Sequence, residues 1–139
     1  NSSHVRISYA VFCLKKKRHD QIRVVHDYPA SQCALAKVVE RDGVPVAERF
    51  ELYLGPLELA NGYHELTDAA EQRVRFERDV ATRSVRGEDA PAIDEGLLAA
   101  LAHGMPDCAG VALGVDRLLM AMLDTPRIAD VVAFDFARA

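Results

Sequence analysis

The alternation of hydrophobic and polar positions is clearest between residues 49 and 60. Apolar side chains at 50, 52 and 54 alternate with more polar neighbours, the period of two that is typical of a half-buried strand. Gly55-Pro56 turns the chain, and residues 57–60 continue as a second apolar segment. The pattern predicts a β-hairpin, after which Asn61-Gly62 indicates a bend or a bulge.

The pattern becomes helical in the middle of the chain. Thr67 or Asp68 can cap a polar surface helix that we predict to run to about Arg86, and Asp68 and Glu71 have the spacing of a capping box. Asp94 is placed to cap a second, shorter helix over residues 95–102, which a glycine and a proline then end.

A glycine-rich apolar segment follows. Residues 110–113 are typical of a buried strand, and an apolar helix is predicted to begin at Asp116, in the capping position. Residues 128–134 predict a further strand or a short helix–strand pair. Gly114 and Arg117 lie at the strand–helix junction, where backbone N–H groups and a fixed cation favour a polyphosphate.

The first 27 residues are the least regular part of the sequence. Residues 5–11 alternate weakly, as a strand does, and residues 15–18 form a basic run that is more typical of a solvated turn than of a binding patch. Proline at position 29 favours a break in regular structure. We therefore leave residues 1–27 as an unassigned N-terminal segment and expect the domain to occupy residues 28–139.

Composition narrows the class of protein. The 139 residues suffice for one domain or part of one, and 50% apolar with 27% charged residues is typical of a globular protein. A net charge of -4 and the absence of tryptophan argue against nonspecific nucleic-acid binding. The three cysteines form no Cys-x-x-Cys pair, and no apolar stretch is long enough for a membrane span, so we expect a cytoplasmic protein.

Two acidic residues of the hairpin are candidate metal ligands. Glu51 and Glu58 lie on successive predicted strands, and a shared face would bring their carboxylates close enough to need a cation between them. On spacing alone, two solvated surface glutamates are the simpler interpretation.

A second polar set alternates in the segment that follows. Asn61, Tyr63 and Glu65 project to one side of an extended chain, and an amide, an aromatic ring and a carboxylate suit a small ammonium ligand. Ordinary polar surface is again the alternative for these residues taken alone. His64 projects to the opposite side, where we expect a structural or exposed histidine.

Two long motifs favour the functional interpretation, because the chain resembles the class II lysyl-tRNA synthetases. Residues 58–68, Glu-Leu-Ala-Asn-Gly-Tyr-His-Glu-Leu-Thr-Asp, resemble the segment before motif 3 of that family, and residues 104–118 resemble motif 3 itself. Within the superfamily the chain is most similar to the tRNA-independent elongation factor P lysine ligases. Residues 29–32 resemble their Pro-Ala-Ser-Gln segment, and Ala60 and Ala112 stand where synthetases have glycine.

The resemblance implies both a fold and a reaction. The implied fold is α+β, an antiparallel β-sheet flanked by helices that forms the C-terminal half of a class II aminoacyl-tRNA synthetase catalytic domain. The implied reaction is the ATP-dependent activation of lysine or (R)-β-lysine as an adenylate and its transfer to a lysine of elongation factor P. The family resemblance also implies ATP and Mg²⁺ as cofactors and a homodimer, with tRNA the less favoured acceptor.

The matched positions are the family's ligands for metal, nucleotide and amino acid. The residues that match the Mg²⁺ and ATP carboxylates are Glu51 and Glu58. Those that match the amino-acid pocket are Asn61, Tyr63 and Glu65, with Ala112 reshaping it. The ATP contacts of motif 3 are matched by Gly114 and Arg117. Arg117 and Glu58 are thereby implied as the catalytic residues.

Two alternative functions stay open. A fragment of a lysyl-tRNA synthetase would charge tRNA, and a non-catalytic remnant would bind nucleotide or a partner without chemistry. Motifs 1 and 2 of class II enzymes have no recognisable counterpart in these 139 residues. We therefore expect an incomplete chain with weak or no catalysis by itself, and an exposed sheet edge that dimerisation or further residues would cover.

Overall fold

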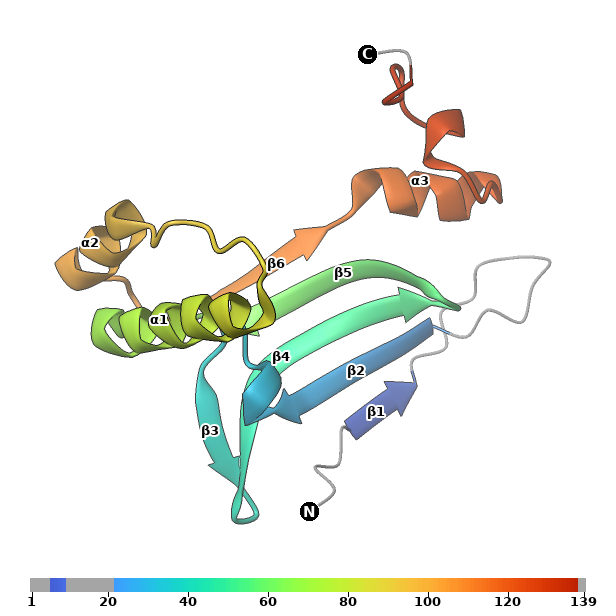
Figure 1. Ribbon diagram of the computed structural model, residues 1–139. Helices are drawn as coiled ribbons and strands as arrows, with labels where there is room; N and C mark the ends of the chain where they lie inside the picture. Colours follow the sequence, from blue (N-terminus) through green and yellow to red (C-terminus); the bar gives the residue numbers. More distant parts are fainter. Residues whose placement is uncertain (1–5, 10–21, 138–139) are drawn as a thin grey trace.

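A single antiparallel sheet organises the computed structural model, which describes residues 6–9 and 22–137. Its strand order is β1-β2-β4-β5-β6, and β3 pairs with β4 beside this path (Figure 1). The strands of this described part are β1 Arg6–Tyr9, β2 Ile22–Pro29, β3 Val38–Arg41, β4 Val44–Leu54, β5 Leu57–His64 and β6 Ala109–Leu113. The antiparallel sheet and its helices confirm the expected α+β class.

Two of the three α-helices in the described residues precede strand β6 in the chain, and the third follows it. Helices α1 (Ala69–Arg86) and α2 (Glu95–His103) connect β5 to β6, and α3 (Val115–Leu123) follows β6. Helices α1 and α2 lie together at one end of β6, whereas α3 lies beyond its other end (Figure 1). Two short 3-10 helices, η1 (Ala30–Gln32) and η2 (Ile128–Asp130), complete the described elements. No helix in the described ranges has the length and apolar character needed to cross a bilayer.

The predicted caps of α1 and α2 are confirmed. The Asp68 carboxylate accepts hydrogen bonds from the backbone N–H groups of Ala70 at 2.8 Å and Glu71 at 2.9 Å. Asp94 likewise accepts from the N–H of Leu97 at 2.9 Å. These bonds satisfy donors that the first turn of a helix leaves free, which is why both helices begin where the sequence places them.

Gly62 lies inside β5, so the predicted bend or bulge at Asn61-Gly62 is wrong. A Cβ atom at Gly62 would lie only 2.8 Å from Cζ of Phe50 and 2.9 Å from the carbonyl oxygen of Gly110. Glycine therefore serves close packing here between β4 and β6, and not a turn. The bulge that does occur in this strand comes earlier, at Leu59.

The C-terminal third also differs from prediction in three details. Strand β6 is an exposed edge, with Val111 63% exposed, and not a buried strand. Gly114 is the N-cap of α3 and forms no side-chain cap, so Asp116 lies in the first turn. Residues 128–134 form the short helix η2 followed by turns, and no strand.

The N-terminal region takes part in the sheet where it is described. Strand β1 lies within the weakly alternating segment 5–11, and β2 begins at Ile22. Tyr28, chosen as the domain boundary, lies inside β2. The basic run 15–18 lies outside the described residues.

Candidate functional site

The predicted site residues meet on one face of the sheet. The pairing register places Asn61 between Glu51 on β4 and Ala112 on β6, and Tyr53 opposite Glu58. Directly paired residues of antiparallel strands point to the same side. We call this side the site face; its residues include Arg49, Glu51, Tyr53, Glu58, Asn61, Tyr63 and Ala112.

A bulge in β5 brings Glu58 to the site face. Ala60 pairs with Leu52 and Glu58 pairs with Tyr53, so Leu59 is an extra residue with no partner on β4. Without this extra residue, Glu58 and Asn61 would point to opposite sides, because side chains alternate along a strand. With it, the Asn61 amide nitrogen lies 3.4 Å from Oε1 of Glu58.

A second irregularity brings Tyr28 to the site face. The pairing of β2 with β4 shifts between His26 and Tyr28, and Asp27 there has a left-handed φ of 57°. Tyr28 therefore points to the same side as Glu51, and its hydroxyl donates to Oε2 of Glu51 at 2.5 Å. Two residues of β4, 48 and 49, lie opposite the single residue Asp27. Nothing in the sequence pattern marks this irregularity except aspartate, one of the residue types that tolerates a left-handed conformation.

Glu51 is a buried carboxylate held by three donors. Its side chain accepts hydrogen bonds from the hydroxyls of Tyr28 and Tyr53, and it forms an ion pair with Arg49. Burial disfavours the charged form, but the donors outweigh it and lower the pKa of Glu51 below its ordinary value. A carboxylate has about four acceptor positions, so this one retains room for a single further ligand.

The two predicted metal carboxylates share a face but are separated by Tyr53. The hydrogen bond to Glu51, then burial and the charges of Glu51 and Glu58 raise the pKa of Tyr53 to about 12. The hydroxyl donates to Glu51, and Tyr53 pairs directly with Glu58 across the two strands. Within the described ranges, no group of three or more His, Cys, Asp or Glu side chains is arranged to hold a metal ion. Any ion bound here would need further ligands, such as phosphate or water oxygens.

Arg49 forms part of the site face and was missed by the sequence analysis. Its guanidinium lies 4.5 Å from the ring centroid of Tyr28 and 5.7 Å from that of Tyr63. It also donates to the carbonyl oxygen of Gln32 at 3.1 Å. The cation that Tyr63 contacts in this structure is therefore Arg49. The sequence did contain a signal for this position: Arg49 lies two residues before Glu51 on the same predicted strand and therefore on the same face.

Glu65 reaches the site from the end of β5. Its backbone N–H donates to the carbonyl oxygen of Cys108 at 2.9 Å, which fixes it beside the start of β6. The carboxylate lies directly over Gly110, where a Cβ atom would overlap it. Within the described part of the chain, this carboxylate has no hydrogen bond or ion pair, in contrast to those of Glu51 and Glu58.

Arg117 and Gly114 approach Glu58 from the start of α3. Arg117 Nη1 donates to the carbonyl oxygen of Glu58 at 3.0 Å and lies 3.8 Å from Oε2 of its carboxylate. Gly114 is tied to β5 by its N–H, which donates to the Leu59 carbonyl oxygen at 2.8 Å. Half of the Arg117 side chain remains exposed, so its other N–H groups are available to an anion.

Comparison with known proteins gives a consistent result. A family model described as tRNA synthetases class II (D, K and N) matches residues 2–138. The chain is 57% identical over 115 residues to a protein of Edwardsiella ictaluri named Elongation factor P--(R)-beta-lysine ligase. Proteins of the same name from Mannheimia succiniciproducens and Pectobacterium carotovorum are 60% identical over 111 residues and 53% identical over 120 residues.

These relatives are considerably longer than the chain. The alignments cover 83%, 80% and 86% of this chain but only 35%, 34% and 37% of the three relatives, in the same order. The chain thus spans about a third of the length of the curated relatives it matches.

Proposed function

The chain belongs to the class II tRNA synthetases (D, K and N), and we propose that its native protein activates lysine or (R)-β-lysine with ATP and transfers it to a lysine of elongation factor P. The name shared by relatives at 53–60% identity supports this substrate and this acceptor. A tRNA acceptor is the second candidate, since the family includes tRNA synthetases.

The observation that carries the proposal is the state of the Glu65 carboxylate. In the described part of the chain, Glu51 and Glu58 have charged partners, whereas Glu65 is tied down by its backbone and keeps its carboxylate free. A carboxylate positioned in this way suits a substrate ammonium group, with Asn61 and Tyr63 on the same face beside it.

The reaction needs no nucleophile from the protein. A carboxylate oxygen of the amino acid attacks the α-phosphorus of ATP, and pyrophosphate leaves. The amine of the acceptor lysine then attacks the carbonyl carbon of this adenylate, an amide forms, AMP leaves, and the amine proton passes to solvent. The protein contributes by orienting the reactants and by stabilising the negative charge.

The described residues divide these tasks between two ends of the site face. Glu65, Asn61 and Tyr63 would orient the amino acid, and Ala112, which pairs directly with Asn61, would border the same ligand. Arg117 is held against Glu58 and directs its remaining donors to the phosphates, next to the N-terminus of α3 at Gly114. Mg²⁺ would neutralise phosphate charge, held by Glu58 and by the one free position of Glu51.

We further propose a cytoplasmic homodimer. The described cysteines, Cys33 and Cys108, are free thiols, which suits a reducing compartment. The exposed edge of β6 is a surface that a second subunit or further polypeptide would cover.

The test is the exchange of labelled pyrophosphate into ATP by the native polypeptide that carries this chain. Lysine or β-lysine should support exchange, and Glu65→Gln should lower amino-acid affinity by about 30-fold, because an ammonium loses a charge-assisted hydrogen bond. Glu88→Gln, at an exposed glutamate just after the C-terminal end of α1, is the matched control.

The acceptor is identified in the same preparation. Elongation factor P should gain the mass of one lysyl or β-lysyl group, while tRNA should remain uncharged. Charging of tRNA with unmodified elongation factor P would favour the second candidate. Absence of exchange with either amino acid would contradict both.

A further inference from the structure

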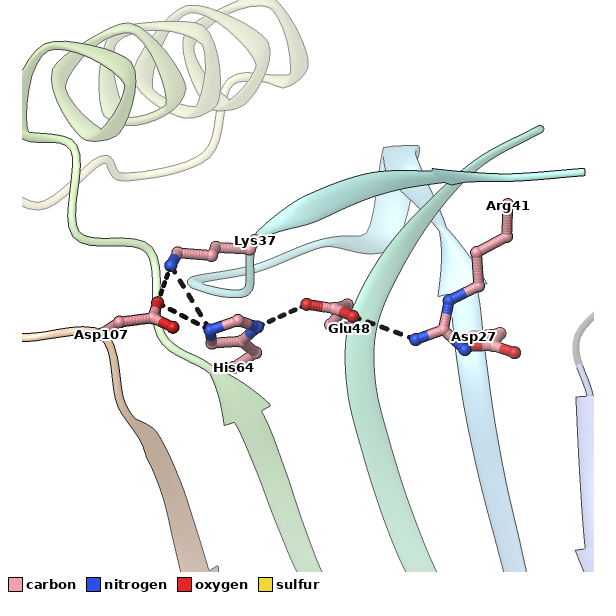
Figure 2. Close-up of polar contacts among 6 residues, drawn as sticks. All are labelled: Asp27, Lys37, Arg41, Glu48, His64 and Asp107. Atoms are coloured by element: carbon pink, nitrogen blue, oxygen red, sulfur yellow. Dashed lines mark hydrogen bonds and ion pairs between the residues drawn. The ribbon is translucent and has the colours of Figure 1, made fainter. Parts of the chain in front are cut away.

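A network of charged side chains occupies the face of the sheet opposite to the site. His64 lies between two carboxylates: its Nε2 is 2.8 Å from Oδ1 of Asp107, and its Nδ1 contacts Oε2 of Glu48. Figure 2 shows these contacts as one continuous line across the strands. The neighbouring charges are Lys37, whose Nζ contacts Asp107, and Arg41, which lies 3.0 Å from both Glu48 and Asp27.

The two carboxylates favour the charged form of His64, although Lys37 Nζ also lies 3.3 Å from Nε2. A carboxylate only accepts, so hydrogen bonds to Glu48 and Asp107 together need two ring N–H groups, which only the imidazolium has. The hydrogen bonds with Glu48 and then with Asp107 raise the pKa of His64, despite the opposing charge of Lys37. The same contact with His64 lowers the pKa of Glu48.

Three chain segments meet where Glu65 follows the end of β5: residues 35–37, residues 64–66 and residues 107–108. The charged network links these segments. Lys37 N–H donates to the His64 carbonyl oxygen at 2.8 Å, and Leu66 N–H donates to the Leu35 carbonyl oxygen at 2.9 Å. On the other side, Glu65 N–H donates to Cys108 at 2.9 Å, one residue after Asp107. The side chains of His64, Lys37 and Asp107 therefore contact one another between the same segments that the backbone hydrogen bonds join.

We propose that His64 is a positioning residue: held as an imidazolium between Glu48 and Asp107, it fixes the junction that aims the Glu65 carboxylate at the substrate amine. This inference rests on the proposed function, in which Glu65 binds that amine. His64 itself lies on the opposite face and touches no substrate. It acts on amino-acid binding, and not on the nucleotide, because Arg117 and Glu58 lie at the other end of β5.

The first test compares His64→Gln with the matched control His103→Gln in the native polypeptide. His103 is an exposed residue at the end of α2. Calorimetry should show about tenfold weaker binding of lysine or β-lysine in the His64 variant, the loss of about one charge-assisted hydrogen bond, and an unchanged affinity for ATP–Mg²⁺. The His103 variant should match the unaltered protein for both ligands.

A double variant separates positioning from a general structural effect. If His64 acts through Glu65, then adding His64→Gln to Glu65→Gln should cause little further loss of amino-acid affinity. Losses that multiply in the double variant would overturn the inference. Asp107→Ala removes one acceptor of the imidazolium without changing His64, and should reproduce the selective loss even where the His64 variant folds poorly.

The pH dependence is a third readout and needs no variant. Amino-acid affinity of the unaltered protein should fall as pH rises through the folded pKa of His64, because the neutral ring donates from one nitrogen only. The His64→Gln protein should show no such step. Equal amino-acid affinity in the variant, while the unaltered protein binds, would overturn this inference alone. Failure of the unaltered protein to bind either amino acid would overturn the proposed function as well.

Discussion

Three glutamates of the site have the same side chain but different surroundings. Glu51 is buried and held by Tyr28, Tyr53 and Arg49, whereas Glu58 is partly exposed beside Arg117. In the described ranges Glu65 is anchored by its backbone and keeps a free carboxylate. The proposed roles therefore rest on environment and not on residue type: Glu51 is largely occupied by protein donors, whereas Glu65 is left open to a ligand.

At the residue scale, Tyr28→Phe tests the supporting role of Glu51. The variant leaves a buried carboxylate with one donor fewer, so the free energy of unfolding at pH 7 should fall by about 2 kcal/mol. Urea denaturation measures this loss. Tyr63→Phe is the matched control, because the Tyr63 hydroxyl has no hydrogen bond in the described part of the chain.

The same variant has a defined pH dependence. The folded pKa of Glu51 is lowered, so the stability that it contributes is present above its unfolded value of 4.5 and is lost as pH falls through the folded pKa. Removing a donor raises that folded pKa. The difference between Tyr28→Phe and the unaltered protein should therefore be smaller at pH 3.5 than at pH 7, and an equal difference at both would contradict this assignment.

At the scale of elements, two arginines of α1 show how burial decides how much a side-chain contact contributes to stability. Arg73 forms a bidentate pair with Glu95 of α2, but both side chains are exposed. Arg75 is only 12% exposed and donates to the carbonyl oxygens of Ala34 at 3.0 Å and Ala36 at 2.7 Å. It thereby joins α1 to the segment that leads into β3.

We expect Arg75→Met to lower the free energy of unfolding by about 2 kcal/mol, because it leaves two carbonyl groups without a donor. Arg73→Met should cost at most about 0.5 kcal/mol, since exposed pairs contribute little. Chemical denaturation of both variants gives the comparison. Similar losses for the two would show that the helix pair, and not the link to β3, carries the stability.

The close packing of three strands at Gly62 gives a second prediction at this scale. Gly62→Ala places a Cβ against Phe50 and the Gly110 carbonyl, so it should destabilise the protein by about 2 kcal/mol. Gly96→Ala, in helix α2, should change stability by less than about 1 kcal/mol, because only the Asp94 carboxylate lies near, at 3.2 Å. Phe50→Leu should recover part of the loss at Gly62, measured again by urea denaturation.

At the scale of the whole molecule, one edge of the sheet is unprotected in the described structure. Val111 and Leu113 of β6 are 63% and 50% exposed, and Met122 and Leu123 of α3 are 71% and 62% exposed. An apolar edge strand with free backbone groups pairs readily with another chain. We therefore expect the isolated 139-residue chain to associate as its concentration rises.

Sedimentation velocity measures the association of the chain, and a lysine introduced on the β6 edge tests whether this edge forms the contact. Val111→Lys should shift the chain toward the monomer, whereas Val85→Lys, at an 89% exposed position on α1, should leave association unchanged. Association that is insensitive to Val111→Lys would place the contact on another surface.

Local signals in the sequence were sufficient for most elements. The hairpin of β4 and β5 follows from a period of two, and α1 and α2 follow from Asp68 and Asp94 at their caps. The errors arise where a long-range contact overrides a local signal. Gly62 is a turn residue by propensity, but Phe50 and β6 take the space of its side chain. The apolar pattern of β6 indicates burial, although its position at the sheet edge leaves it exposed.

The sequence by itself determined the family, the β4–β5 hairpin and the caps of α1 and α2, and it named the candidate site residues, because motif wording and periodicity are properties of neighbouring residues. Strands β2 and β3 were not predicted. Only the tertiary structure decided how those residues meet. The irregularity at Asp27 and the bulge at Leu59 bring Tyr28 and Glu58 to the site face, and each reverses an alternation that the sequence pattern would extend. The tertiary structure also placed His64 between carboxylates from two other segments. Such register and charge contacts depend on strand pairing across the sheet, which no local pattern encodes.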